Sequence, residues 1–386
     1  MKACVMCGGL GTRLRPLTLE RPKPLIPLLN KPSVVHLIEH LRGEGVTDVV
    51  MTLGYLGEMI EEAVSDIEGV NTTCVYEKSA LGTAGGVRNA REHLRSGTFM
   101  VVGGDHVLDL QLNRIYRFHE QSDAIVTIGL ICIDNPFEYG ICDMDARNVI
   151  HRFIEKPDPG EAFSNLINTG VYVCNPEILD WIPDEGMCDF ANDVFPALLD
   201  AGEEIDGYLV QGRWTDIGNH EMYRTACKWK LDKMYAQGPT PNPTPNVDPA
   251  SDATDRIRDP VSIGEGTTIG SSMIVGPVVI GEDTVIGDDV VIGPHTTIGS
   301  GCVIEDGAHI LTSYIFDDVR IGKGSLVFSS ILDTGSRVRE NCSLETGTVL
   351  GSRAVVNDYA ILSDVLIWHD KVVQEGEHTR NNMVDQ

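Results

Sequence analysis

Short apolar runs alternate with helical patterns along the first half of the chain. The runs predict strands at residues 3–7, 49–53, 73–76 and 99–102. The patterns between them predict helices at residues 32–41, at residues 59–64 and after residue 84. This alternation is typical of an α/β fold with a Rossmann-like, doubly wound sheet, which we predict over residues 1–236. Ligands bind such sheets beyond the carboxyl ends of the strands. The glycine loop that starts at residue 8, and Asp105, fall at such ends, so we expect a ligand site there.

Beyond residue 260 the apolar positions recur with a period of six. The repeating residues are isoleucines, most of them followed by glycine, at Ile263, Ile269, Ile280, Ile286, Ile292, Ile298, Ile304 and Ile310. A period of six fits neither a helix nor a flat strand; it is the hexapeptide repeat of a three-sided prism. We predict a left-handed parallel β-helix over residues 261–373, with room for about six coils of about 18 residues each. A polar tail at 374–386 would follow it.

Residues 237–260 separate these two patterns. Prolines recur there among Thr, Asn and Asp, at Pro239, Pro241, Pro243, Pro245 and Pro249. Such a composition stays extended and exposed, so the segment is predicted to be a linker.

Composition limits the class of protein. A length of 386 residues with 42% hydrophobic content suggests two or three soluble domains. The apolar stretches are short and no secretory segment precedes the first strand, so we expect a cytoplasmic protein without a membrane span. Cys4 and Cys7 form a Cys-x-x-Cys inside that strand, on opposite faces and without a second pair at metal spacing. Buried, reduced thiols are therefore expected rather than zinc.

The charge is strongly acidic and dispersed. A formal net charge of −27 argues against nucleic-acid binding. The 10 lysines against 20 arginines resemble the usage of proteins from salt-loving microbes, where salt screens self-repulsion. Against this background the first 31 residues hold six cations and one carboxylate, Glu20. Cations thus gather where a polyphosphate would bind.

A glycine turn with cations and prolines follows the first predicted strand. Gly8, Gly9 and Gly11 allow backbone N–H groups to approach a phosphate chain closely, and Arg13 and Lys23 supply positive charge. No Gly-Lys-Ser/Thr follows, so this is not a Walker loop. The prolines of the segment exclude a long helix, and an extended, stiff loop is expected between the two cations. The string indicates a nucleoside-triphosphate site.

This string closely resembles the opening of the sugar-phosphate nucleotidyltransferases, also called sugar-nucleotide pyrophosphorylases, and its details are most similar to the GDP-mannose pyrophosphorylases. Further family strings follow in family order over nearly the whole chain, at Leu81-Gly82-Thr83-Ala84-Gly85-Gly86, Gly104-Asp105, Glu155-Lys156-Pro157, Asn168-Thr169-Gly170 and Trp214-Thr215-Asp216-Ile217-Gly218. The resemblance implies that residues 1–236 are a nucleotidyltransferase catalytic domain.

The resemblance also implies roles for individual residues. Those implied in nucleotide binding are Gly8, Gly9, Leu10, Gly11, Thr12, Glu77, Gly82 and Thr83. Three cations are implied as catalytic: Arg13 on the departing β- and γ-phosphates, Lys23 on the α-phosphate, and Lys156 on the sugar phosphate. Residues implied in the hexose pocket are Gly140, Glu155 and Asn168, and those implied in holding Mg²⁺ are Asp105 and Asp216.

Each of these residues also has a simpler interpretation. Asp105 follows an apolar run and Asp216 lies in a Gly-terminated turn, where carboxylates suit a hard cation but also cap turns. The Glu155–Lys156 pair ends an edge-strand pattern and could be surface charge. Gly140 and Asn168 could serve turn formation alone.

Glu77 bears on the choice of base. It stands five residues before Gly82, where guanylyl-transferring relatives tend to have Glu and uridylyl- or thymidylyl-transferring ones Gln. One carboxylate can accept both N1–H and N2–H of guanine, whereas uracil and thymine present acceptors that would repel it. The alternative is a solvated strand-end charge, with the backbone of Gly82 and Thr83 reading the base. Departures from the family pattern at Gly103, His106 and Asn219-His220 leave substrate choice more open than reaction type.

We therefore expect an Mg²⁺-dependent enzyme that makes a nucleotide sugar and pyrophosphate by in-line displacement, with GTP and mannose 1-phosphate giving GDP-mannose. The alternative enzyme uses UTP or dTTP with glucose 1-phosphate, and a further alternative is a catalytically silent regulatory partner. The β-helix could carry acyltransferase activity, but His295 and His309 lie in no recognisable acceptor loop. Assembly into a homo-oligomer is the expected use of that domain.

Overall fold

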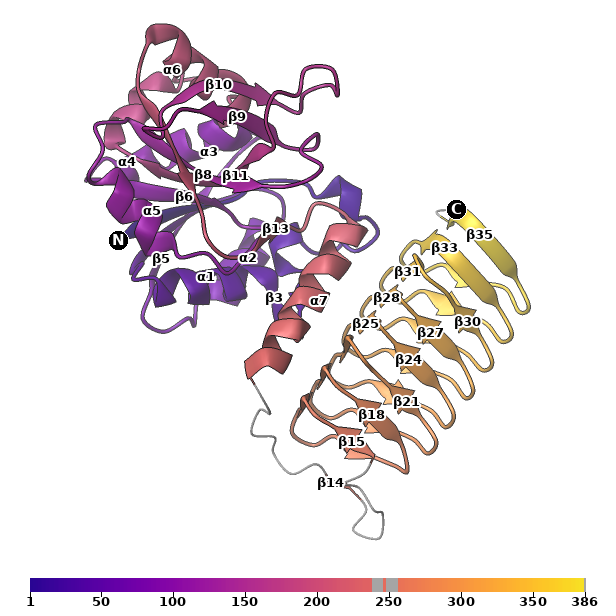
Figure 1. The fold of residues 1–386 in the computed structure, drawn as a ribbon. Helices are drawn as coiled ribbons and strands as arrows, with labels where there is room; N and C mark the ends of the chain where they lie inside the picture. Colours follow the sequence, from indigo (N-terminus) through magenta and orange to yellow (C-terminus); the bar gives the residue numbers. More distant parts are fainter. Residues whose placement is uncertain (238–245, 248–255, 385–386) are drawn as a thin grey trace. The chain divides into compact units, whose positions relative to one another are not determined.

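The computed structural model describes residues 1–237, 246–247 and 256–384. Contacts divide the chain into two units (Figure 1). The first unit comprises Met1–Gly11, Arg21–Ile26 and Pro32–Gly218, and the second comprises Thr12–Glu20, Pro27–Lys31 and Asn219–Gln386. Within the part of the chain that the structure describes, no helix combines the length and apolar content needed to cross a bilayer.

A nine-stranded sheet forms the centre of the first unit. Its parallel half has the order β6-β1-β4-β5, formed by β1 (Lys2–Cys7), β4 (Asp48–Leu53), β5 (Asn71–Tyr76) and β6 (Phe99–Gly103). The helices between them are α1 (Ser33–Gly43), α2 (Gly57–Val64), α3 (Gly82–Asn89) and α4 (Arg91–Leu94). The predicted alternation is confirmed. β1 is central, so its carboxyl end lies where the strand order reverses, the usual ligand position in such sheets.

Each face of the sheet has its own apolar core. α1, α2 and α5 (Leu112–His119) cover one face, and α3 and α6 (Phe195–Ala201) cover the other. β1 and β4 are continuous apolar runs because both of their faces are buried. Cys4 belongs to one core and Cys7 to the other, which confirms that these thiols point to opposite faces.

The other half of the sheet is largely antiparallel, which the sequence pattern did not predict. β11 (Leu166–Cys174) joins it to β6, and beyond it lie β8 (Val126–Cys132), β9 (Gly140–Met144), β10 (Ile150–Glu155) and β12 (Ile205–Leu209). A separate antiparallel pair consists of β7 (His106–Leu108) and β13 (Trp214–Asp216). A 3-10 helix at Pro176–Trp181 and a π-helical turn at Phe190–Val194 precede α6.

The segment between Gly11 and Pro32 is compact rather than extended, so that prediction was wrong. It contains 3-10 turns at Thr12–Leu14 and Lys23–Leu25, a chain of i→i+3 hydrogen bonds between them, and the short strands β2 (Pro27–Leu28) and β3 (Lys31–Pro32). The prolines exclude a long helix as expected, but a proline also suits a short turn, as Pro24 does in the 3-10 turn Lys23–Leu25.

The second unit is built on a parallel β-helix, which confirms the hexapeptide interpretation. One face consists of β14 (Asn246–Val247), β17 (Thr268–Ile269), β20 (Val285–Ile286), β23 (Val303–Ile304), β26 (Arg320–Ile321), β29 (Arg337–Val338), β32 (Val355–Val356) and β34 (Val372–Val373). The second face consists of β15 (Ile257–Arg258), β18 (Met273–Val275), β21 (Val291–Ile292), β24 (His309–Leu311), β27 (Leu326–Phe328), β30 (Ser343–Leu344) and β33 (Ile361–Ile367).

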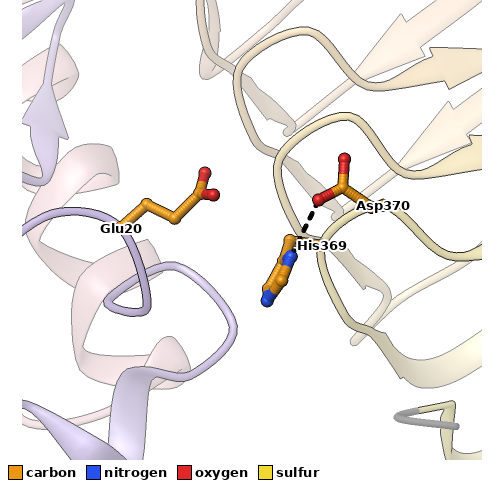
Figure 2. A group of neighbouring side chains, drawn as sticks. All are labelled: Glu20, His369 and Asp370. Carbon is orange, nitrogen blue, oxygen red and sulfur yellow. Dashed lines mark hydrogen bonds and ion pairs between the residues drawn. The ribbon is translucent and has the colours of Figure 1, made fainter.

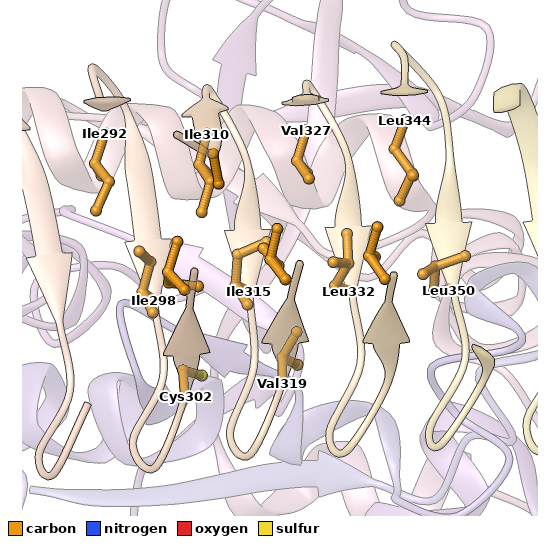
Figure 3. Packing of buried hydrophobic residues seen from close by; sticks show 14 of the residues in the cluster. Ile292, Ile298, Cys302, Ile310, Ile315, Val319, Val327, Leu332, Leu344 and Leu350 are labelled. Atoms are coloured by element: carbon orange, nitrogen blue, oxygen red, sulfur yellow. The ribbon is translucent and has the colours of Figure 1, made fainter. Parts of the chain in front are cut away.

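The third face consists of β16 (Val261–Ile263), β19 (Val278–Ile280), β22 (Thr296–Ile298), β25 (Tyr314–Ile315), β28 (Ile331–Leu332) and β31 (Val349–Leu350). β33 pairs with β30 and also with β31, so it continues from the second face to the third. Branched residues from successive coils stack inside the prism, as Ile298, Ile315, Leu332 and Leu350 do (Figure 3). This axial stack is the core of the unit.

The long helix α7 (His220–Gln237) packs on the β-helix within the second unit. The ring centroids of Tyr223 and Tyr314 lie 5.7 Å apart, with the rings edge-on to each other. The Tyr314 hydroxyl donates to the Arg224 carbonyl at 3.1 Å. Outward-facing Ile331 and Val349 are also fully buried.

The boundaries differ from the predicted division of the chain. Residues 12–20, 27–31 and 219–236 group with the β-helix rather than with the rest of residues 1–236. The predicted linker at 237–260 lies mostly outside the described residues. β15 precedes the predicted β-helix range, and β35 (His378–Val384) pairs with β33 inside the predicted tail.

Candidate active site

Two strand ends meet where the sheet reverses its order. β1 runs into Gly8, and its parallel neighbour β6 runs into Gly104 and Asp105. The Gly104 amide donates to the Met6 carbonyl at 2.8 Å, and a Cβ at Gly104 would collide with the Cys7 sulfur. A glycine is therefore required at this position, and it brings Asp105 close to the start of the glycine turn.

Asp105 is paired with Lys23. The Lys23 ammonium forms an ion pair with Asp105 Oδ2, and both side chains are largely buried, with 14% and 24% of their surfaces exposed. Burial alone would raise the pKa of Asp105, but the charge of Lys23 and its hydrogen bond outweigh this and lower the pKa to about 2. The carboxylate is thus kept ionised.

The pairing of β7 with β13 brings the second carboxylate to the first. Asp216 lies opposite His106, and the Ile217 amide donates to the Asp105 carbonyl at 3.0 Å. The Tyr139 hydroxyl donates to Asp216 Oδ1 at 3.4 Å. Two carboxylates, one from the turn before β7 and one from β13, are a suitable donor set for a hard divalent cation. The residues predicted to hold a metal are therefore brought together.

Three residues in this region were not singled out as site residues from the sequence. The Trp214 ring lies edge-on to His106 at 5.6 Å and to Tyr139 at 5.4 Å between centroids. Burial lowers the pKa of His106, although Asp105 and Asp216 act in the opposite direction, so the imidazole is neutral at neutral pH. In the sequence, His106 follows Asp105 and Trp214 stands two residues before Asp216. This proximity was the signal that could have identified both as site residues.

The residues predicted for the hexose lie on neighbouring strands. Glu155 of β10 is in register with Gly140 of β9, and a Cβ at Gly140 would come within 2.6 Å of Glu155 Oε2. Burial raises the pKa of Glu155, with Lys156 opposing and Asp189 adding to the effect. Glu155 is thus a half-buried carboxylate and not the surface charge of the simpler interpretation, whereas Lys156 is exposed.

An irregularity in β11 connects this region to the aspartates. The pairing of β11 with β8 shifts register between Asn168 and Tyr172. Asn168 Oδ1 accepts from the Gly170 amide at 2.8 Å, and its Nδ2 donates to the Tyr172 hydroxyl at 3.0 Å. Gly170 has φ +71°, and a Cβ there would lie 2.9 Å from His106 Cε1. Asn168 therefore holds the irregular backbone that packs against His106.

Glu77 lies against the glycine turn. Cβ atoms added to Gly8 and Gly86 would come within 2.8 Å and 2.7 Å of its carboxylate oxygens. Burial raises the pKa of Glu77, partly offset by hydrogen bonding at Leu81 and Thr52. Gly8 thus serves the close approach of Glu77, a contact that the sequence did not predict.

The turn is exposed at Gly9 and Leu10. A Cβ at Gly9 would meet nothing within 4 Å, Gly11 has φ +62°, and the Leu10 side chain is 56% exposed. No packing contact in the described structure accounts for glycine at position 9, in contrast to Gly8.

Gly82 and Thr83 are occupied by structural contacts. Gly82 has φ +77°, and a Cβ there would lie 2.5 Å from the Cys188 carbonyl oxygen. The Thr83 hydroxyl donates to Asp189 Oδ1 at 3.0 Å and accepts from the Phe190 amide at 3.0 Å. These residues join α3 to the segment before the π-helical turn.

Thr12 and Arg13 belong to the second unit, in the 3-10 turn Thr12–Leu14. The Arg13 side chain is exposed. A peptide bond to Gly11 connects this turn directly to the glycines of the first unit.

Known proteins match both parts of the chain. A family model described as Nucleotidyl transferase matches residues 2–233, and one described as GMPPB C-terminal domain matches residues 274–384. A probable mannose-1-phosphate guanylyltransferase 3 of Oryza sativa subsp. japonica is 33% identical, and mannose-1-phosphate guanylyltransferase 1 of Arabidopsis thaliana is 32% identical, each alignment covering 93% of both chains.

Solved structures match the first part of the chain. HddC from Yersinia pseudotuberculosis is 25% identical with a TM-score of 0.52, covering 59% of this chain and 99% of that chain. The same protein complexed with GMP-PN is 26% identical with a TM-score of 0.51, over 59% and 99% of the two chains. Since the family model covers residues 2–233 and the relatives align along nearly the whole length, the chain belongs to the nucleotidyl transferase family.

Proposed function

We propose that this protein is a mannose-1-phosphate guanylyltransferase, which forms GDP-mannose and pyrophosphate from GTP and mannose 1-phosphate. The observation that carries the choice of nucleotide is the Glu77 carboxylate against Gly8, at the start of the glycine turn. The names of the aligned plant relatives support the same reaction.

The proposed chemistry is an in-line displacement. A phosphate oxygen of mannose 1-phosphate attacks the α-phosphorus of GTP, the bond from that phosphorus to the β-phosphate oxygen breaks, and pyrophosphate leaves. Lys23 neutralises the α-phosphoryl oxygens, Arg13 the leaving pyrophosphate, and Lys156 the attacking phosphate. Alignment and charge stabilisation carry this reaction, and no protein nucleophile is needed.

Asp105 and Asp216 are the residues we propose to hold Mg²⁺. The support is their donor chemistry and the strand pairing that brings them together. The ion would supply positive charge to the phosphate oxygens. The Lys23 ammonium is paired with Asp105. It therefore lies beside the proposed ion, and both positive charges can act on one phosphate group.

Glu77 is proposed to read the base. Its carboxylate can accept the N1–H and N2–H of guanine together. The backbone of Gly82 and Thr83 is less suited to read the base, because the Thr83 amide already donates to Asp189 Oδ1 at 2.9 Å. Gly9, Leu10, Gly11 and Thr12 remain the proposed phosphate-binding segment.

Glu155 is proposed to accept hydrogen bonds from the mannose hydroxyls. Its half-buried carboxylate lies against Gly140, whose missing side chain makes room for it. Asn168 is proposed to shape the same pocket through the irregular backbone of β11.

Further properties are proposed on composition and fold. The −27 charge with few lysines favours activity in high salt, and ten cysteines without a disulfide fit the cytoplasm. We propose that residues 1–236 carry the reaction and that the β-helix at 261–373 supports a homo-oligomer. His295 Nε2 is bonded to Asp232 of α7 at 2.7 Å, which gives this histidine a contact within the second unit.

The test is pyrophosphate release by the full chain in molar KCl with Mg²⁺, crossing GTP, UTP, dTTP and ATP with mannose 1-phosphate and glucose 1-phosphate. Fast release with GTP and mannose 1-phosphate alone is expected. Preference for UTP or dTTP with glucose 1-phosphate would retain the mechanism and discard the role of Glu77. No release in any combination would favour the regulatory partner.

A further inference from the structure

Glu20 is the one carboxylate among the first 31 residues, and Arg353 of the β-helix binds it. Both residues belong to the second unit. Arg353 Nη1 donates to Glu20 Oε2 at 2.9 Å and Nη2 donates to Oε1 at 2.6 Å, so the guanidinium grips the carboxylate with two parallel bonds. The Ser352 hydroxyl adds a third bond to Oε2 at 2.6 Å. Hydrogen bonds from Arg353, then from Ser352, lower the pKa of Glu20 to about 2.

Arg353 is itself held by the next coil of the β-helix. Its Nε donates to Asp370 Oδ1 at 2.7 Å and its Nη2 to Asp370 Oδ2 at 2.9 Å. His369 Nδ1 lies 3.0 Å from the same Asp370 oxygen. Figure 2 shows Glu20 facing the turn that carries His369 and Asp370. The guanidinium therefore joins two carboxylates, one from the β-helix and one from segment 12–20.

These contacts also explain why Glu20, His369 and Asp370 come together. Each offers one atom that could ligate a metal. Both oxygens of Glu20 and both of Asp370 already accept from Arg353, however, so the cluster is a paired ion network. The cluster therefore holds segment 12–20 on the β-helix and is not a cation site. We call the paired contact between Arg353 and Glu20 the clamp.

Segment 12–20 is held at two further points. His220 Nε2 lies 3.2 Å from the Leu14 carbonyl oxygen, and a Cβ at Gly351 would come within 3.0 Å of Pro16 Cβ. Leu14, Pro16 and Leu17 are buried, whereas Arg13 between these anchors and Gly11 is exposed. The anchors fix the backbone on which Arg13 stands and leave its side chain available.

We propose that Arg353 is a positioning residue for nucleotidyl transfer: through Glu20 it holds the segment that presents Arg13 to the departing pyrophosphate. This inference rests on the proposed function, since it takes the role of Arg13 from there. It gives the β-helix a part in the reaction through a contact about 330 residues away along the chain.

Displacing Arg13 should change kcat more than KM. Charge on the leaving pyrophosphate develops in the transition state, so a displaced Arg13 lowers kcat more than it changes the KM for mannose 1-phosphate. A loss of roughly 10- to 100-fold in kcat is expected for a displacement of about one ångström. The clamp is half-exposed to solvent, so its loss should leave thermal unfolding nearly unchanged.

The experiment measures pyrophosphate release and thermal unfolding of the full chain for Arg353→Gln, Glu20→Gln and the double variant. Each single variant should lose kcat by a similar factor, and the double variant should lose no more than either one. Arg353→Lys, which keeps the charge but loses the planar fork, should fall between Arg353→Gln and wild type. The matched control is Lys323→Gln, which removes another exposed β-helix ion pair, with Asp306 at 3.4 Å, and should keep wild-type kcat.

A second arm tests whether the effect runs through Arg13. In an Arg13→Lys background, Arg353→Gln should cost clearly less than in wild type, because the group being positioned has already been replaced. Wild-type kcat in Arg353→Gln, or a full additional loss in the Arg13→Lys background, would overturn the proposal. Hydrogen exchange of residues 12–20 should be faster in Arg353→Gln, and unchanged exchange would also overturn it.

The two proposals fail differently. If wild-type protein releases no pyrophosphate with any substrate pair, the proposed function fails, and the positioning role fails with it. If wild type is active and the clamp variants are equally active, the proposed function stands and the positioning role alone is rejected.

Discussion

The Lys23 ammonium and the Asp105 carboxylate form an ion pair at the carboxyl end of β6. Lys23 comes from the turn-rich segment after Pro22, and Asp105 from the end of a buried strand. The pair joins the residue proposed for the α-phosphate to a residue proposed for the metal. A cation and an anion that are both proposed to act in the reaction thus stabilise each other.

Replacing Asp105 tests the metal proposal. Asp105→Asn removes a ligand charge and frees Lys23, so pyrophosphate release should fall by roughly 100-fold or more, and more Mg²⁺ should be needed for half-maximal rate. The measurement is initial rate against Mg²⁺ concentration. Asp143→Asn on the exposed side of β9 is the matched control and should behave as wild type. An unaltered Mg²⁺ dependence in Asp105→Asn would contradict the assignment.

The same pair predicts how stability depends on pH. The pKa of Asp105 is lowered to about 2 in the folded chain, against about 3.9 for an unperturbed aspartate. Its contribution, on the order of 2 kcal/mol, is therefore fully present above about pH 4 and is lost as pH falls toward 2. Urea unfolding at pH 7 and pH 3 should give a larger drop for wild type than for Asp105→Asn. Equal drops would show that other carboxylates carry the acid sensitivity.

Replacing Glu77 tests the choice of base. Glu77→Gln keeps the shape but gives the side chain an amide donor, so the preference for GTP over UTP should weaken by roughly 10-fold or more. The measurement is the ratio of kcat/KM for the two nucleotides. Burial raises the pKa of Glu77, so the wild-type preference for GTP should decline as pH is lowered through that pKa. The exposed Glu68→Gln is the control. An unchanged ratio in Glu77→Gln would discard the argument.

Alanine substitutions at two glycines should impair different steps of nucleotide binding. A Cβ at Gly86 would lie 2.7 Å from Glu77 Oε1, so Gly86→Ala should displace that carboxylate and weaken the base preference. A Cβ at Gly9 would meet nothing, so Gly9→Ala should fold normally and raise the KM for every nucleoside triphosphate alike. Thermal unfolding and kcat/KM for GTP and UTP separate the two effects. If Gly9→Ala binds nucleotides as wild type does, the turn does not hold the phosphates.

Replacing Glu155 tests the sugar pocket. Glu155→Gln weakens the acceptor proposed for mannose hydroxyls, so the KM for mannose 1-phosphate should rise by roughly 10-fold while the KM for GTP stays unchanged. Arg152→Gln on the same strand, an exposed position, is the control. A rise in the KM for GTP instead would place Glu155 with the nucleotide.

Local pattern was sufficient for much of the fold. Apolar runs predicted β1, β4 and β6, because parallel strands buried on both faces are mostly apolar. The half-exposed β5 was predicted from a shorter run. The hydrophobic period also predicted the β-helix, since each coil repeats the same inward positions. Apart from the edge-strand pattern at β10, the largely antiparallel half of the sheet was not predicted, because its pairing depends on partners far along the chain.

The amino-acid sequence by itself determined which residues are candidates for phosphate chemistry. Glycines, cations and carboxylates follow the predicted strand ends, and the family resemblance implies a role for each of them. Only the tertiary structure decided which of them meet: Lys23 with Asp105, Glu77 with Gly8, Trp214 with His106, and Glu20 with Arg353. The physical reason is range. Secondary structure follows from neighbours within a few residues, whereas a site is assembled by packing segments whose separation in the chain carries no periodic signal.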